Sequence, residues 1–178
     1  MKFSKVRDVK SPTRGTSKSA GIDFYVPNFD LAPWDMPHSL IQRKLGVPHI
    51  VVLPRTDVLI PSGIKVNLPS GYMLMAADKS GVVTSRAACL DAGRFPKDDA
   101  FNSAVVIGAK IVDEDYQGEV YIHLINTGTS IIYIKPGMKI AQFILVPVSY
   151  EELEEVPVGE LYPEVSERGE GGFGSTNK

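Results

Sequence analysis

The chain has 178 residues, of which 43% are hydrophobic and 22% are charged, enough apolar content for one globular domain with a real core. Its formal net charge of -2 offers no basic surface to a nucleic-acid backbone, so a DNA or RNA partner is not expected, whereas a single nucleotide fits. Cys89 is the single cysteine, and residues 1–5 open no apolar run typical of a signal peptide or a membrane helix. We therefore expect a protein of the cell interior, cytoplasmic or nuclear, and not a secreted or membrane protein.

The apolar stretches of the chain are short, rich in β-branched residues and separated by glycine and proline. They predict strands at residues 50–53, 64–68, 120–126, 131–134 and 143–148. Tight turns are predicted at Pro61-Ser62-Gly63, Pro69-Ser70-Gly71, Asn126-Thr127-Gly128 and Pro136-Gly137. A short helix is expected after Ser80, while residues 150–155 are typical of an acidic linker. The pattern indicates an all-β sandwich or barrel.

Two segments interrupt this succession of strands and are predicted to be insertions. One spans residues 28–48 and carries Trp34, and the other spans residues 91–103 and is rich in charge. Both are expected to form surface loops, because long connections in compact domains run over the surface.

An acidic segment at residues 113–119 lies between two apolar runs. Aspartate and glycine favour turns for backbone reasons, so a solvated turn explains the segment locally. The alternative rests on Asp113, which follows Ile111 and Val112 and so suits the rim of a buried strand. Partial loss of water there would help the carboxylate act as a base.

Other candidate sites are weaker. Ser80, next to Lys79, would suit a phosphate if it opens a short helix, and a simple turn or N-cap explains the same residues. His38, His49 and His123 show none of the zinc-binding spacings, and no Ser-His-Asp motif is present. A metal site built from side chains alone is therefore not expected.

The last eleven residues, which begin at Arg168, are rich in glycine and cannot hold one conformation by themselves. Arg168 suits a phosphate and Phe173 suits a flat base. Gly169, Gly171 and Gly174 match the pattern G-x-G-x-x-G, but too few residues follow for the helix that a dinucleotide fold requires. A disordered terminus and an arm ordered by a ligand both fit the sequence.

Taken in order, five segments resemble the five motifs of the homotrimeric dUTP pyrophosphatases, the dUTPase family. They are residues 20–24 (AGIDF), 79–81 (KSG), 108–119 (GAKIVDEDYQGE), 137–142 (GMKIAQ) and 168–176 (RGEGGFGST). The third and fifth segments are specific, and the five together span most of the chain. The resemblance implies a distorted jelly-roll subunit over residues 1–160, with residues 161–178 as an arm that closes over an active site of the trimer.

The resemblance also implies hydrolysis of dUTP to dUMP and pyrophosphate, by attack of water on the α-phosphorus with Asp113 as the general base. Tyr116 would lie against the deoxyribose and exclude a 2′-hydroxyl, and main-chain groups from Gly108 to Ile111 would read the uracil. Phe173 would stack over the base. The substrate contacts implied are Lys79, Ser80, Gly81, Gly108, Ile111, Tyr116, Tyr121, Gln142, Arg168, Phe173, Gly174, Ser175 and Thr176.

Mg2+ is the cofactor that the resemblance implies, carried mainly by the triphosphate and by water, with Asp23 orienting that shell indirectly. Two residues depart from the family pattern. Lys79 stands where arginine is usual, which keeps the charge and loses the bidentate geometry, and Lys110 stands where glycine is common. The Lys110 side chain is therefore expected to point away from the uracil.

Two other functions are compatible with these residues. A dCTP deaminase of related fold would release ammonia from the base, although the complete glycine arm and the intact third segment favour the pyrophosphatase. A nucleotide-gated regulatory protein could keep every motif and bind a partner through its insertions.

Overall fold

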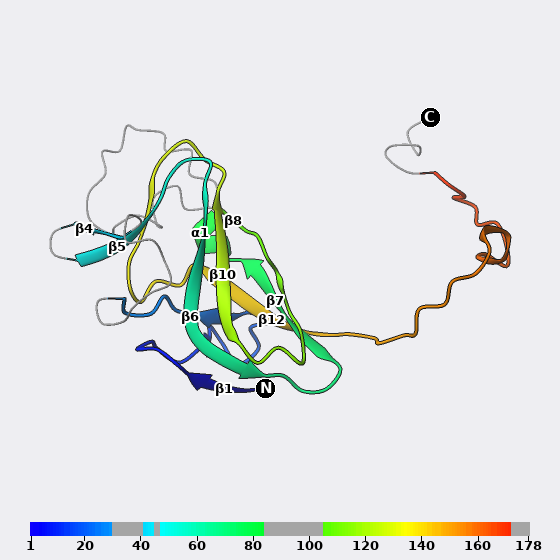
Figure 1. The fold of residues 1–178 in the computed structure, drawn as a ribbon, viewed down its shortest axis with the longest axis horizontal. Helices are drawn as coiled ribbons and strands as arrows, with labels where there is room; N and C mark the ends of the chain where they lie inside the picture. The colour runs from blue at the N-terminus through cyan, green and yellow to red at the C-terminus, as the bar shows by residue number, and fades with distance from the viewer. Residues whose placement is uncertain (30–40, 45–46, 84–104, 172–178) are drawn as a thin grey trace. The chain divides into compact units, whose positions relative to one another are not determined.

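The computed structural model describes residues 1–29, 41–44, 47–83 and 105–171, drawn in colour in Figure 1. The chain forms two units, Met1–Val148 and Ser149–Lys178. Strands make up almost all of the regular structure in the first unit. In the part of the chain that the structure describes, no helix is long and apolar enough to cross a membrane.

A four-stranded antiparallel sheet has the order β1-β6-β10-β8, and Figure 1 shows its two long central strands side by side. Its strands are Lys2–Lys5 (β1), Asp57–Asn67 (β6), Val105–Ile107 (β8) and Glu119–Asn126 (β10). In β10 the buried Val120, Ile122 and Leu124 alternate with the more exposed Tyr121 and His123. This alternation turns one face of the sheet towards the core and leaves the other face open.

A five-stranded antiparallel sheet has the order β2-β3-β12-β7-β9. Its strands are Thr13–Arg14 (β2), Ile22–Phe24 (β3), Tyr72–Asp78 (β7), Ile111–Val112 (β9) and Ala141–Pro147 (β12). The rings of Phe24 and Phe143 are fully buried, with centroids 4.3 Å apart. Both belong to one hydrophobic cluster with Ile122 and Leu124 of the other sheet. The two sheets therefore share a single core, as in a β-sandwich.

A smaller three-stranded sheet has the order β11-β5-β4. Its strands are Ile41–Lys44 (β4), Val47–Val52 (β5) and Ile132–Ile134 (β11). Ile50 pairs with Ile41 on one side and with Ile134 on the other. Since Ile50 and Ile134 are both fully buried, this pairing attaches the small sheet to the core.

The prediction of a surface loop over residues 28–48 is wrong where it covers β4 and the start of β5. The apolar run that begins at Val47 gains a partner on each side, and an isolated strand would leave those main-chain groups unpaired. Residues 30–40, which include Trp34, and residues 45–46 lie outside the described part of the chain. The predicted insertion at residues 91–103 lies outside it as well.

The predicted turn at Pro61-Ser62-Gly63 is also wrong. These residues lie inside β6, where a β-bulge shifts the register against β10 between Glu119 and Tyr121. Gly63 has a φ of 73°, a left-handed conformation that glycine adopts at little cost, and its N–H donates to Glu119 Oε1 at 2.6 Å. A bulge is the other common role of glycine in a strand pattern. The other three predicted turns are present.

Each of the five predicted strands overlaps an observed strand. The one α-helix in the described residues, Ser80–Val83 (α1), confirms the short helix predicted after Ser80. In the second unit the described residues form no strand and a single 3-10 turn, Val158–Glu160 (η2). Leu153 is fully exposed, as expected for a linker. The all-β fold class is confirmed.

Candidate active site

Strand β12 brings the first, second and fourth of the five segments together at one end of the five-stranded sheet. Gln142 pairs with Asp23 of β3 on one side and with Ala77 of β7 on the other. Since β7 ends at Asp78 and Lys79 comes next, the three segments meet where β7 ends.

Asp23 is the charged centre of this region. Its Oδ1 accepts a hydrogen bond from Lys79 Nζ at 2.8 Å, and its Oδ2 accepts one from Lys139 Nζ at 3.0 Å. Asp23 is 5% exposed; burial by itself would raise the pKa of this carboxyl, but the two ammonium groups outweigh burial and hold the pKa below its usual value. The carboxylate in turn raises the pKa of Lys139. These three residues, the cationic cluster, combine one negative and two positive groups and so suit an anion.

Gln142 connects the same segments through its side chain. Its Nε2 donates to Asp78 O at 2.8 Å, and a Cβ on Gly21 would overlap Gln142 Oε1. A larger residue at position 21 would therefore displace the Gln142 amide from this position. Asp78 Oδ1 also accepts a hydrogen bond from the Ile107 N–H at 2.7 Å, which ties β8 to this region.

Ser80 and Gly81 begin α1 directly after Lys79. Ser80 is exposed, and the Val82 N–H donates to Lys79 O at 2.8 Å. A helix of four residues is too short to carry an anion site on its dipole. The Lys79 ammonium group, rather than the helix end, therefore supplies the positive charge of the second segment.

The third segment, called the 108–119 segment, begins along the opposite edge of β7. Ile111 of β9 pairs with Met75, and the Ala76 N–H donates to Lys110 O at 2.6 Å. The Lys110 side chain is exposed. Ile111 is 61% exposed, which leaves an apolar side chain open to solvent at the predicted uracil position.

Asp113 follows β9 and is exposed. Its main-chain oxygen accepts a hydrogen bond from the Tyr116 N–H at 3.2 Å, so the chain turns directly after the strand. Among the residues that the structure describes, none pairs with the Asp113 carboxylate or covers it. The partial loss of water predicted for this side chain is therefore not supplied by the described part of the chain.

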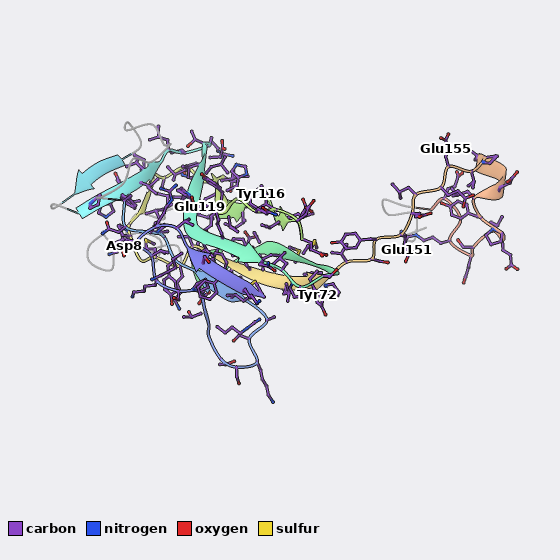
Figure 2. The ribbon with its side chains drawn as sticks, turned by 60° about the horizontal axis from the view of Figure 1, so that its bottom comes forward. Asp8, Tyr72, Tyr116, Glu119, Glu151 and Glu155 are labelled. Carbon is purple, nitrogen blue, oxygen red and sulfur yellow. The ribbon has the colours of Figure 1, made fainter. Side chains whose placement is uncertain are left out.

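Tyr116 is held by its own turn. Its OH donates to Glu119 O at 2.9 Å, and a Cβ on Gly118 would overlap the Tyr116 oxygen. Figure 2 shows Tyr116 and Glu119 close together. The Glu119 carboxylate is fixed by Arg7 Nε at 2.8 Å. Tyr116 is 43% exposed and Tyr121 is 37% exposed, so both rings remain accessible to a ligand.

Within one chain Asp113 and the cationic cluster do not meet. Val112 pairs with Leu74, whereas Gln142 pairs with Ala77. The two positions on β7 are three residues apart, about 10 Å of strand, and Asp113 lies one residue further away. A single chain thus joins the first, second and fourth segments and holds the Asp113 end of the third apart from them.

The fifth segment begins in the second unit. Arg168 Nε donates to Gly171 O at 2.7 Å. Gly169 has a φ of 50°, and its N–H donates to Ser166 O at 3.0 Å. These contacts form a local turn at the start of the predicted arm. The predicted contacts of four residues stay predictions because these residues lie outside the described part of the chain: Phe173, Gly174, Ser175 and Thr176.

Asp23 is the residue predicted to act towards Mg2+. Among the described residues, no group of three His, Cys, Asp or Glu side chains is placed to hold a metal ion. Both oxygens of Asp23 accept hydrogen bonds from ammonium groups, and these charges repel a nearby cation. The residues present therefore fit Mg2+ only through intervening water or through a triphosphate.

Sequence reasoning misses the roles of Lys139 and His123. Lys139 lies in the fourth segment, three residues before Gln142, and the pairing of β12 with β3 is what places its ammonium group on Asp23. His123 is weighed in the sequence only as a metal ligand. In the structure its Nδ1 accepts a hydrogen bond from the Ala109 N–H at 3.1 Å. The signal in the sequence is that His123 lies between two apolar residues of a predicted strand, which places it on the open face of β10.

Comparison with known proteins gives one consistent result. The family model for dUTPase matches residues 48–177. Deoxyuridine 5'-triphosphate nucleotidohydrolase of Chlamydia muridarum is 33% identical over 140 residues, which covers 78% of this chain and 82% of the relative. The enzyme of the same name from Dictyoglomus turgidum is 29% identical over 174 residues, covering 96% and 92% of the two chains.

Solved structures give the same fold. The dUTPase of Staphylococcus bacteriophage 80alpha with dUPNHPP superposes with a TM-score of 0.70 at 21% identity, covering 98% of this chain and 96% of that one. A mutant dUTPase from phage phi11 of S. aureus, described with a coordinated structural Mg(II) ion, has a TM-score of 0.61 at 18% identity and covers 87% and 95%. These superpositions confirm the jelly-roll-like, all-β fold class.

Proposed function

The chain belongs to the dUTPase family, and we propose from this membership that it hydrolyses dUTP to dUMP and pyrophosphate. The observation that carries the proposal is the match of the family model over residues 48–177. The meeting of Asp23, Lys79 and Gln142 at one end of the sheet supports it, because it provides an anion site. Such an activity limits the incorporation of uracil into DNA and supplies dUMP for the synthesis of dTMP.

The triphosphate is assigned to the cationic cluster and its neighbours. Lys79 and Lys139 supply positive charge, and the Gln142 amide and the Ser80 hydroxyl supply directed hydrogen bonds. Arg168 would add a third positive charge from the arm. Mg2+ would come with the triphosphate, neutralise part of its charge and face Asp23 through water.

Asp113 is assigned as the general base. It takes a proton from a water molecule while the water oxygen attacks the α-phosphorus, the bond to the bridging oxygen breaks, and pyrophosphate leaves with the electron pair. The exposed position of Asp113 in a single chain lets water reach it. Covering the same carboxylate by nucleotide or by another chain would raise its basicity through desolvation.

The base and the sugar are assigned to the 108–119 segment. Main-chain groups from Gly108 to Ile111 would read the uracil edge, since strand donors and acceptors match an imide and not the amino group of cytosine. The Tyr116 ring, fixed through Glu119 O, would leave no space for a 2′-hydroxyl. The exposed Ile111 and Tyr121 would border the same pocket, with Phe173 of the arm stacked over the base.

The active protein is assigned as a homotrimer whose sites are shared between copies. Support comes from the distance of about 10 Å along β7 that separates the third segment from Gln142 in one chain. The test mixes Asp113→Asn chains with Gln142→Ala chains, each inactive alone. Shared sites would restore about a quarter of the wild-type activity in an equal, reassembled mixture. An unchanged, inactive mixture would place the whole site in one chain.

Product analysis tests the reaction itself. The chain is incubated with each deoxynucleoside triphosphate and Mg2+, and dUMP and pyrophosphate are expected from dUTP alone. Ammonia from dCTP without pyrophosphate from dUTP would instead identify a deaminase and refute the proposal.

A further inference from the structure

One histidine outside the proposed catalytic groups contacts the start of the 108–119 segment through two bonds. The Gly108 N–H donates to His123 O at 2.8 Å, and the Ala109 N–H donates to His123 Nδ1 at 3.1 Å. A Cβ on Gly108 would overlap Nδ1 of the same ring. The main chain at the proposed uracil site therefore rests directly against the imidazole.

The hydrogen bonds fix the state of the ring. A main-chain N–H can only donate, so Nδ1 must carry the lone pair, and the ring proton of a neutral imidazole lies on Nε2. His123 Nε2 lies 2.9 Å from Asp57 Oδ2, and this carboxylate accepts a hydrogen bond from the Nε2–H group. Asp57 thereby selects the tautomer in which Nδ1 is the acceptor.

The connection between β8 and β9 is short, because β8 ends at Ile107 and β9 begins at Ile111. The end of this connection is held by the hydrogen bond that Lys110 O accepts from the Ala76 N–H. Between these anchors the Ala109 N–H donates to the His123 ring. The direction in which the chain leaves β8 therefore depends on Nδ1.

We propose that His123 is a positioning residue for base recognition, whose Nδ1 holds the main chain of Gly108 and Ala109 in the geometry that reads uracil. The inference rests on the proposed function, in which that main chain binds the base. It gives His123 a role in substrate affinity and none in the chemical step, because the ring contacts the segment ahead of Ile111 and not Asp113.

Two substitutions separate positioning from stabilisation. His123→Asn places an amide oxygen near the position of Nδ1, so it keeps the acceptor and loses Asp57. His123→Gln places its amide near the position of Nε2, so it keeps Asp57 and loses the acceptor. We expect the Gln variant to raise the KM for dUTP about tenfold with kcat nearly unchanged, and the Asn variant to stay within about twofold of the wild type.

The assay includes a probe that carries the base and the sugar without the pyrophosphate of dUTP. Calorimetry with dUMP should show the same loss of about tenfold for the Gln variant, while the affinity for pyrophosphate stays unchanged. A structural role alone would affect the two variants alike, in proportion to their melting temperatures, and that result would overturn the inference. Equal KM values for the Gln variant and the wild type would overturn it too.

Asp57→Ala removes the partner of Nε2 and leaves His123 itself unchanged. The Asp57 side chain is 62% exposed, so the fold should tolerate its loss. Freed from Asp57, the imidazole can exchange tautomers, and the KM should rise about twofold to fivefold; a wild-type KM would count against the tautomer argument. Absence of dUMP from the wild-type chain would refute the proposed function and this inference together, whereas an active wild type with indistinguishable variants refutes the inference alone.

Discussion

The cationic cluster and the 108–119 segment belong to the same proposed active site, yet a single chain fixes them to different degrees. In the cluster, the buried carboxylate of Asp23 is paired at both oxygens with lysines of two other segments. In the segment, Asp113 is exposed and Ile111 is 61% exposed. Opposite charges can neutralise one another as the chain folds, whereas a base that must admit water and a nucleotide has to stay open. Folding thus forms the cationic cluster in advance, whereas the 108–119 segment stays open for a nucleotide.

The largest effect should come from the exposed 108–119 segment. Asp113→Asn removes the proton acceptor without changing the shape, and kcat should fall by about 100-fold to 10,000-fold, measured as pyrophosphate release. Assembly and nucleotide binding should persist. Asp115→Asn, at an exposed neighbour, is the matched control and should turn over dUTP like the wild type. Normal turnover of the Asp113 variant would mean that another group activates the water.

Removal of the arm tests whether the arm is needed to close the open 108–119 segment over a bound nucleotide. A chain that ends at Glu167 lacks the whole fifth segment but keeps all strands of the first unit. We expect kcat/KM to fall on the order of 100-fold, with an unchanged circular dichroism spectrum and trimer mass in sedimentation. A chain lacking only Asn177 and Lys178 serves as the control. Full activity of the longer truncation would remove the arm from the mechanism.

A change at Gly118 tests Tyr116, the side chain of the 108–119 segment that its own turn holds in place. Gly118→Ala introduces a Cβ that overlaps the Tyr116 oxygen, so the ring must move. The KM for dUTP should rise about tenfold and discrimination against UTP should weaken. Gly159→Ala is the matched control, because a Cβ there meets no atom within 4 Å. Unaltered discrimination in the Gly118 variant would separate Tyr116 from sugar recognition.

The smallest effect should come from the cationic cluster and should appear as a change in the free energy of unfolding. The pKa of Asp23 in the folded state lies below its usual value. The ionised carboxylate therefore stabilises the fold at pH values above about 3.9, the pKa of the unfolded state. That contribution is lost as the pH falls through the folded pKa. Asp23→Asn should therefore lower the free energy of unfolding at pH 7 by about 1–2 kcal/mol. The variant should also lose stability less steeply below about pH 4.

Urea unfolding at pH 7, 4 and 3 measures this effect, with Asp115→Asn as an exposed control. Parallel pH profiles for the wild type and the Asp23 variant would show that the lysine pairs contribute nothing to the fold, and the contrast between the two regions would then lose its energetic basis.

Sequence reasoning predicted the strands well and the special glycines less well. Alternation of buried and open side chains, as in β10, is a local signal that survives in the fold. Gly63 is different, because the same three residues suit a turn or a bulge, and the choice depends on Glu119, more than fifty residues away. Strand β4 was missed for a related reason, since it becomes a strand only beside β5.

The site shows the same division between local and distant causes. Asp113, Tyr116 and Gln142 are visible in the sequence because each lies in a contiguous motif. Lys139 contacts Asp23 of β3, and His123 contacts Ala109 in the connection between β8 and β9. No spacing along the chain reveals such pairs. Strand register, which the sequence does not state, decides them.

Glu119 connects Arg7 near the N-terminus to Tyr116, the residue proposed to contact the sugar. Its carboxylate binds Arg7 and the Gly63 N–H, while its main-chain oxygen accepts the Tyr116 hydroxyl. By linkage, whatever pulls Arg7 away weakens the hold on Tyr116, and a nucleotide bound against Tyr116 strengthens the attachment of the first strand to the same extent. An extension ahead of Met1 that displaces Arg7 from Glu119 is therefore expected to alter the recognition proposed for Tyr116.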